Sequence, residues 1–158
     1  MAEKKRVLVI CLGNICRSPI GEAVFQDIIR KESLENKWEV HSAALIGYHT
    51  GKSPDHRAMS TLRDKGITNY SHKARPISKD DFETFDWIFG MDNENISHLN
   101  RMKPQGSKAK VELLGKYDPQ GEVIIRDPYY DDDSEGFVKA YEQCVRSVAS
   151  FLEKHRSN

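Results

Sequence analysis

The sequence predicts an α/β fold: a single doubly wound, four-stranded parallel sheet in the order 2-1-3-4, with helices on both faces. Two observations predict it. Residues 6–10 (RVLVI) form a continuous apolar run, which is typical of a parallel strand buried on both faces. Strand-like and helix-like segments then alternate along the chain, which indicates right-handed crossovers between parallel strands. The 158 residues, 38% hydrophobic and 30% charged, fit a single domain over residues 1–158.

The first strand and the first helix flank a short segment that favours a turn. The strand at residues 6–10 runs into Gly13 and Asn14, which both tolerate the left-handed backbone of a sharp turn. Pro19 then fits the first turn of a helix, where no backbone N–H is needed. Apolar side chains at helical spacing follow: Ala23, Val24, Ile28 and Ile29.

The second strand is expected at residues 38–42. Residues 43–53 contain two glycines and mixed polarity, so we expect a loop there. A helix is expected over residues 54–66 and should end at Gly66, because glycine readily adopts the left-handed backbone that terminates helices. A short helix is expected at residues 78–85.

The rest of the chain completes the alternation. The expected segments are a strand at 86–90, a helix at 92–101, a strand at 110–114, a loop at 117–133 and a long helix at 134–155. Asp92 is expected to cap its helix, since a carboxylate accepts hydrogen bonds from the free N–H groups of the first turn. The last helix is amphipathic, and its expected inner stripe is Val138, Tyr141, Val145, Val148, Phe151 and Leu152.

The loop after the first strand carries a motif that points to phosphate chemistry. In doubly wound sheets, ligands bind beyond the strand ends where the strand order reverses, and this loop lies there. It reads CLGNICRSP, with Cys11 and Arg17 separated by five residues. Backbone N–H groups at a helix N-terminus bind anions, and the planar fork of Arg17 can hold two phosphate oxygens. The same positive environment favours a thiolate on Cys11, which is a nucleophile for phosphorus.

Five segments resemble one known family, the low-molecular-weight protein tyrosine phosphatases, also called low-molecular-weight cytosolic acid phosphatases. The resemblance covers essentially the whole chain. It is carried by VLVICLGNICRSPIGEAVF, HKAR, FDWIFGMD, RDPYYDDDSEGF and EQCVRSVASFLEK.

The resemblance implies a metal-free, cofactor-free hydrolysis of phosphotyrosine and small aryl phosphates in two steps. Cys11 would attack phosphorus and form a phosphocysteine, while Arg17 holds the phosphate. Asp127 would protonate the leaving phenolate and then act as a base toward water. The expected phosphate-binding residues are Leu12, Gly13, Asn14, Ile15, Cys16, Arg17 and Ser18. Asp131, Asp132 and Asp133 are expected to be solvated acids of a surface turn.

The resemblance also implies supporting roles. Ser18 would stabilise the Cys11 thiolate as it leaves, and it could also cap the helix. Asn14, Ser42 and His72 would form a hydrogen-bond network that braces the loop. Aromatic walls around a substrate ring are expected from Tyr48, Tyr129 and Tyr130.

A redox role is expected for Cys16, which would capture oxidised Cys11 as a disulfide. Cys144 is placed far away, at the polar-to-apolar boundary of the last helix. Three residues depart from the family's usual pattern and bear on substrate preference: Tyr48, where many relatives have tryptophan, Asn93, where some carry an acid, and Gly21, where alanine is more usual.

Composition narrows the partners and the location. Lys+Arg and Asp+Glu both number 24, so the net charge is zero, which argues against duplex nucleic acid as a partner. No apolar run reaches the 18 residues of a membrane span, so no membrane partner is expected. Three cysteines, an odd number, favour the cytoplasm over a secreted disulfide framework. The expected partners are phosphotyrosine proteins and aryl phosphates, with inorganic phosphate or vanadate as inhibitors, and the chain is expected to be a monomer or weak homodimer.

Three other functions are weighed against this one. An arsenate reductase of similar fold would use the same loop but needs further cysteines as a disulfide relay, and none lies between Cys16 and Cys144. A binding module that captures phosphotyrosine without hydrolysis would not need the nucleophile and acid together. A metallophosphatase is disfavoured because the six histidines show no ligand-like spacing with carboxylates.

Overall fold

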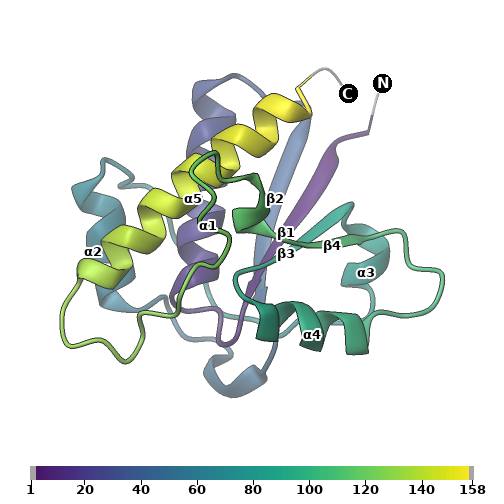
Figure 1. Ribbon diagram of the computed structural model, residues 1–158, viewed down its shortest axis with the longest axis horizontal. Coiled ribbons are helices and arrows are strands. Elements are labelled where there is room, and N and C mark those ends of the chain that lie inside the picture. The colour runs from purple at the N-terminus through teal and green to yellow at the C-terminus, as the bar shows by residue number, and fades with distance from the viewer. Residues whose placement is uncertain (1–2, 157–158) are drawn as a thin grey trace.

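The computed structural model describes residues 3–156 and contains one four-stranded, all-parallel sheet (Figure 1). Its strands are β1 (Lys5–Cys11), β2 (Trp38–Ala44), β3 (Trp87–Gly90) and β4 (Lys110–Leu113). The order β2-β1-β3-β4 confirms the predicted 2-1-3-4 sheet. In the register, Val9 of β1 lies between Ser42 of β2 and Phe89 of β3, so β1 is the central strand whose carboxyl end opens onto the switch point.

Helices cover both faces of the sheet, as predicted (Figure 1). One face carries α1 (Arg17–Lys31), α2 (His56–Asp64) and α5 (Glu135–Lys154). The other carries α3 (Asp81–Thr84) and α4 (Asn93–Met102). Two 3₁₀ segments, η1 (Gly47–His49) and η2 (Leu114–Tyr117), complete the regular structure of the described residues.

The alternation of side chains along β1 explains its unbroken apolar sequence. Val7 and Val9 belong to the core under α1 and α5, whereas Leu8 and Ile10 belong to the core on the α3 and α4 face. Each of the four is at most 1% exposed. Successive side chains of a strand point to opposite faces, so a strand covered on both sides needs apolar residues at every position.

Aromatic side chains fill the core beneath α5. Phe151 is fully buried, and its ring centroid lies 5.0 Å from that of Phe89 and 5.1 Å from that of Trp87, both edge-on. Trp38 of β2 completes this group at 5.4 Å. These edge-to-face contacts anchor the last helix to β2 and β3.

Some predicted boundaries were wrong in detail. The short helix expected at residues 78–85 is a single turn, α3, and the expected loop 43–53 loses its first two residues to β2 and contains η1. The buried stripe of α5 is also rotated from the prediction. Val138, Tyr141 and Val145 are only partly buried, and the deeper positions are Phe137, Ala140 and Cys144.

The position predicted for Cys144 was therefore wrong, since its side chain is fully buried rather than at a boundary. The cause is the close approach of α5 to α1. A Cβ built at Gly21 of α1 would lie 3.9 Å from the Cys144 sulfur, an ordinary van der Waals distance, so Cys144 lies in the interface between the two helices. None of the helices in residues 3–156 is both long and apolar enough to cross a membrane.

Candidate active site

The loop between β1 and α1 is shaped by two residues with special backbone needs. Asn14 adopts the left-handed conformation with φ of 58°, while Gly13 does not. Gly13 is instead required by crowding, because a Cβ there would come within 2.9 Å of His49 Cδ2. The expectation that both residues turn left-handed was thus right for Asn14 alone. The turn brings the loop's N–H groups to the N-terminus of α1, where an anion is favoured.

Cys11 at the end of β1 has a hydroxyl beside its sulfur. Cys11 Sγ lies 3.0 Å from Ser18 Oγ, and both residues are buried. The Asn14 side-chain amide donates to the same Ser18 oxygen at 2.8 Å, which leaves the Ser18 proton free to point at the sulfur. Ser18 does not cap α1, contrary to one expectation, because the N-cap is Cys16 and no side chain accepts there. The Ser18 hydroxyl proton is therefore available for a hydrogen bond to the Cys11 thiolate.

A buried polar network fixes the loop from behind, and it contains the expected Asn14, Ser42 and His72. Asn14 Nδ2 donates to Ser42 Oγ at 3.0 Å, and Asn14 Oδ1 lies 2.7 Å from His72 Nε2. The ring is partly buried, and that burial lowers the pKa of His72. Asn14 thus uses both ends of its amide to link the loop to β2 and to the segment after α2.

Sequence reasoning missed two members of this network, Glu22 and Tyr70. Glu22 Oε1 accepts from Ser42 Oγ at 2.7 Å and from Tyr70 OH at 2.6 Å, and it lies 3.4 Å from His72 Nδ1. Burial and the Glu22 charge raise the pKa of Tyr70, so this hydroxyl stays protonated and donates. The available signal was an acidic residue on the inner face of α1, where a charge needs partners.

Arg17 is buried, with 2% of its surface exposed, and its guanidinium is held by fixed acceptors. Nη1 donates to Asp92 Oδ2 at 2.7 Å and to the Ile125 carbonyl at 2.9 Å. Burial alone would lower the pKa of Arg17, but the Cys11 charge and the Asp92 hydrogen bond raise it. Its buried Nε–H has no partner among the described residues, so one donor remains for a bound anion.

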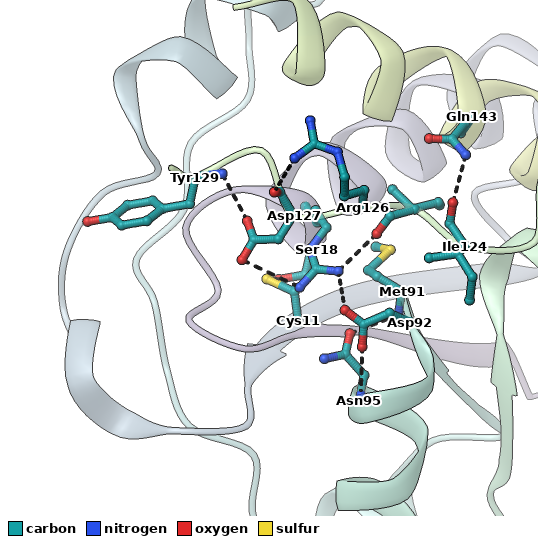
Figure 2. A network of polar contacts seen from close by, with 12 residues as sticks. Cys11, Ser18, Met91, Asp92, Asn95, Ile124, Arg126, Asp127, Tyr129 and Gln143 are labelled. Carbon is teal, nitrogen blue, oxygen red and sulfur yellow. Dashed lines mark hydrogen bonds and ion pairs between the residues drawn. The ribbon is translucent and has the colours of Figure 1, made fainter. Parts of the chain in front are cut away.

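Asp92 has two roles, and only one was predicted. Its Oδ1 accepts from the Asn95 N–H at 2.8 Å, which confirms the helix cap on α4. Its Oδ2 accepts from Arg17 Nη1 and orients that guanidinium, a contact that the sequence did not predict. Figure 2 shows Asp92 beside Asn95 at the start of α4. Asn93, the neighbouring departure from the family pattern, lines a pocket of about 450 Å³ together with Leu12, Arg17, Asp92 and Asp127.

Asp127 lies over the same site on the segment before α5. Its Oδ1 accepts from the Tyr129 N–H at 3.0 Å (Figure 2). Its Oδ2 is 3.7 Å from Arg17 Nη2. The side chain is 36% exposed and so can reach a ligand. Asp131 was expected to be solvated but is paired with Arg126, with a closest approach of 2.6 Å, because the turn folds back on itself. Asp132 and Asp133 are exposed as expected.

A pocket of about 330 Å³ brings the predicted residues together. The loop contributes Cys11, Leu12, Gly13, Ile15 and Cys16, and Asp127 lies at its edge. The walls are Ile46, Tyr48, His49, Tyr129 and Tyr130. Tyr48 and Tyr130 stand at the rim, 77% and 88% exposed, whereas Tyr129 is partly buried. Asn14, Ser18, Ser42 and His72 lie behind the loop rather than in the pocket.

The three cysteines are free, and they differ in chemistry. Cys11 and Cys16 line the same pocket. Burial, with the nearby charge of Cys11, raises the pKa of the Cys16 thiol well above its usual range, so Cys16 stays protonated. Burial likewise raises the pKa of Cys144 to about 12. Within residues 3–156, no group of three or more His, Cys, Asp or Glu side chains could hold a metal ion.

Comparison with known proteins points in the same direction as this geometry. A sequence model of the family described as low molecular weight phosphotyrosine protein phosphatase matches residues 6–158. The pig protein of that name is 52% identical, covering 99% of this chain and 100% of the relative. Among solved structures, Primo-1 superposes with a TM-score of 0.92 at 47% identity, over 96% of this chain and 99% of that chain. The structure titled DARP, drosophila arginine phosphatase, superposes with a TM-score of 0.88 at 37% identity, over 98% of this chain and 99% of that chain.

Proposed function

The chain belongs to the low molecular weight phosphotyrosine protein phosphatase family, metal-independent hydrolases, and on that premise we propose that it hydrolyses phosphotyrosine and small aryl phosphates through a phosphocysteine on Cys11. One observation carries the proposal: Cys11 and Asp127 line one pocket, and Arg17 Nη2 lies 3.7 Å from Asp127 Oδ2. Nucleophile, phosphate clamp and proton donor thus converge on one point, which a phosphoryl transfer requires.

In the first step, the Cys11 thiolate attacks phosphorus and the bond to the leaving phenolate breaks. The loop N–H groups and Arg17 hold the equatorial oxygens, whose negative charge develops in the transition state. Asp127 carries a proton at this stage and gives it to the leaving oxygen. Tyr129 N–H keeps the Asp127 carboxyl oriented over the pocket.

In the second step, water attacks the phosphocysteine and releases inorganic phosphate. The Asp127 carboxylate now takes a proton from that water, which returns the acid to its starting state. The departing Cys11 thiolate accepts a hydrogen bond from the Ser18 hydroxyl, whose oxygen lies 3.0 Å away. No metal is needed for this cycle, because the positive charge comes from Arg17 and the backbone dipoles.

The aromatic pocket supports phosphotyrosine as the substrate class. A tyrosyl phosphate is long enough to place its phosphorus at the buried Cys11 while its ring lies between Tyr48, Tyr129 and Ile46. Inorganic phosphate and vanadate would bind the same loop as inhibitors. We retain the cytoplasm, and a monomer or weak homodimer, as the proposed location and state. The three free cysteines suit a reducing compartment.

The arsenate reductase alternative loses support from the buried position of Cys144. A disulfide relay needs thiols that reach one another and solvent, and this thiol is sealed in the core with a raised pKa. Among the described residues, only Cys16 lines the pocket with Cys11.

The experiment that tests the proposal is hydrolysis of a phosphotyrosine peptide, with phosphoserine and phosphoarginine peptides of the same sequence as controls. The wild type should release phosphate from phosphotyrosine, also with excess EDTA present. Cys11→Ser should abolish turnover but still bind vanadate, because the loop amides and Arg17 remain. Turnover by Cys11→Ser within tenfold of the wild type, or preferential hydrolysis of phosphoarginine, would overturn the proposal.

A further inference from the structure

We propose that Arg57, at the start of α2, positions the proton donor by holding the segment that carries Asp127 against the phosphate-binding loop. This inference rests on the proposed function, because holding that segment matters to the rate only if Asp127 transfers a proton. Arg57 touches neither the pocket nor the nucleophile, so it would be a positioning residue rather than a catalytic one.

Arg57 binds the backbone of the acid segment at two points. Its Nη2 donates to the Tyr129 carbonyl at 2.8 Å, and its Nη1 donates to the Asp131 carbonyl at 2.9 Å. Tyr129 is also the residue whose N–H orients the Asp127 carboxyl. Tyr129 therefore donates its N–H to the Asp127 carboxyl and accepts a hydrogen bond from Arg57 at its carbonyl oxygen. A shift of that residue would move the acid with it.

The same arginine is tied to the phosphate-binding loop through Asp55. The Asp55 carboxylate accepts from Arg57 Nε at 3.1 Å and from Nη2 at 3.0 Å. The Asp55 N–H in turn donates to the Ile15 carbonyl of the loop at 2.7 Å. A continuous chain of hydrogen bonds thus runs from Ile15 through Asp55 and Arg57 to Tyr129, and it sets the distance between nucleophile and acid.

The guanidinium plane is fixed by a third contact. Arg57 Cζ lies 4.5 Å from the centre of the Phe137 ring, which is fully buried in α5. An arginine stacked on an aromatic ring and paired with a carboxylate has few other orientations open to it. Its two donors are therefore aimed at the two carbonyls before any substrate arrives.

Arg126 and Asp131 form a second ion pair that holds this segment, and it contributes less than the contacts of Arg57. Arg126 pairs with Asp131 and donates to the Asp127 carbonyl, as Figure 2 shows for the latter contact. The Arg126 side chain is 65% exposed, and exposed ion pairs contribute little and are screened by salt. Arg57 is 20% exposed, so the buried side of the segment depends on it.

The test compares kcat/KM for a series of aryl phosphates whose phenols range from strongly to weakly acidic. Arg57→Ala should lose about tenfold on the least activated phosphates and almost nothing on the most activated ones, since only the former need a well-placed proton. Arg57→Lys, which keeps the positive charge but lacks the planar fork that reaches both carbonyls, should recover part of the loss. Arg63→Ala on the exposed side of α2 is the matched control and should match the wild type.

A double-mutant cycle separates positioning from general stability. If Arg57 acts through Asp127, Arg57→Ala should cost nothing further in an Asp127→Asn background. Vanadate affinity should stay within about twofold of the wild type, because Arg57 does not touch the phosphate site. Thermal denaturation checks that each variant is folded at the assay temperature.

The possible failures are distinguishable. An Arg57→Ala loss that is equal across the series, or that persists fully in the Asp127→Asn background, would overturn the positioning role and leave the proposed function standing. If Asp127→Asn itself shows no dependence on the leaving group, the proposed role of the acid fails first, and the inference about Arg57 falls with it.

Discussion

Arg17 shows how a side chain can be buried in a site and keep its positive charge. Its guanidinium is almost as inaccessible as the aliphatic core, yet Asp92, the Ile125 carbonyl and the nearby Asp127 surround it with acceptors. Truncating one partner of such a buried group leaves the other unsatisfied, which costs more than the bond itself is worth. The residues around the pocket are therefore interdependent, so a single substitution is compared with a matched control or a double mutant to separate their roles.

Asp127→Asn should slow hydrolysis of phenyl phosphate by roughly 10²–10⁴, the usual contribution of a positioned general acid. The loss should shrink as the leaving phenol becomes more acidic, because an activated phenolate leaves without a proton. Steady-state kcat/KM across a series of aryl phosphates measures this. Asp132→Asn, an exposed acid nearby with the same change in charge, is the control. Equal losses on activated and unactivated substrates would show that Asp127 donates no proton.

Cys16→Ser should make peroxide inactivation hard to reverse. Peroxide would oxidise the Cys11 thiolate to a sulfenic acid, and the Cys16 thiol would displace water from it to form a disulfide that thiol reductants reopen. Activity recovered after peroxide and then dithiothreitol should be nearly complete for the wild type and much lower for Cys16→Ser. Cys144→Ala, which removes a buried thiol outside the pocket, should recover like the wild type. Full recovery of activity by Cys16→Ser would show that Cys16 has only a packing role.

At the scale of elements, the strand, loop and helix from β1 to α1 form one unit whose geometry depends on close contact. Gly21 lies in α1 directly above β1, where a Cβ would come within 2.9 Å of Val9 Cγ1 and 3.3 Å of Met91 Cε. Val9 is a stiff, fully buried side chain that cannot move aside cheaply. The glycine thus sets the spacing between the helix that carries Arg17 and the strand that ends at Cys11.

Gly21→Ala should lower the melting temperature, against the usual stabilising effect of alanine in a helix. Overpacking a core costs about 1–3 kcal/mol, whereas the gain in helix propensity is at most about 1 kcal/mol. The expected net loss of about 1 kcal/mol corresponds to about 2–4 °C for a chain of this size. Calorimetry measures it, with Asn100→Ala on the exposed face of α4 as a propensity control. A rise in melting temperature would mean that β1 and α1 can separate freely.

Local sequence patterns were enough to predict the elements and the centre of the site. The apolar run of β1, the turn residues and Pro19 are neighbours in the chain, so their pattern carries the strand, the loop and the helix start. The contacts that were missed join distant residues. Tyr70 reaches Glu22 across 48 positions, and Arg17 reaches Asp92 across 75. Such contacts depend on how the helices pack against the sheet. The residues adjacent in the sequence do not determine that packing.

On the scale of the whole molecule, stability should depend on pH through buried carboxylates. Asp118, after η2, has a fully buried side chain that accepts from Arg146 Nε at 3.0 Å and Nη2 at 3.1 Å. These hydrogen bonds from α5 lower the pKa of Asp118. The folded protein therefore binds this proton less tightly than the unfolded chain. The resulting stabilisation is present above the unfolded pKa and is lost as the pH falls through the folded value.

Asp118→Asn should cost about 1–2 kcal/mol of unfolding free energy at pH 7, the range of a charged hydrogen bond to a partly exposed arginine. The difference from the wild type should narrow as the pH falls below about 4, because the wild type then protonates Asp118 too. Urea unfolding at pH 7 and pH 3 measures both values. Asp132→Asn should change neither. A difference that stays constant with pH would assign the loss to shape rather than to charge.

The order in which the site is assembled along the chain bears on how the protein is made. Cys11 and the phosphate-binding loop are translated before the segments that complete the site, since Arg17 finds one of its acceptors 108 positions later, at Ile125. Asp127 and α5, the helix that covers the core, are translated later still. A nascent chain therefore carries the nucleophile long before it carries the acid, and domains fold as units once they are released. A product truncated before Asp127 therefore has the reactive cysteine without the proposed proton donor.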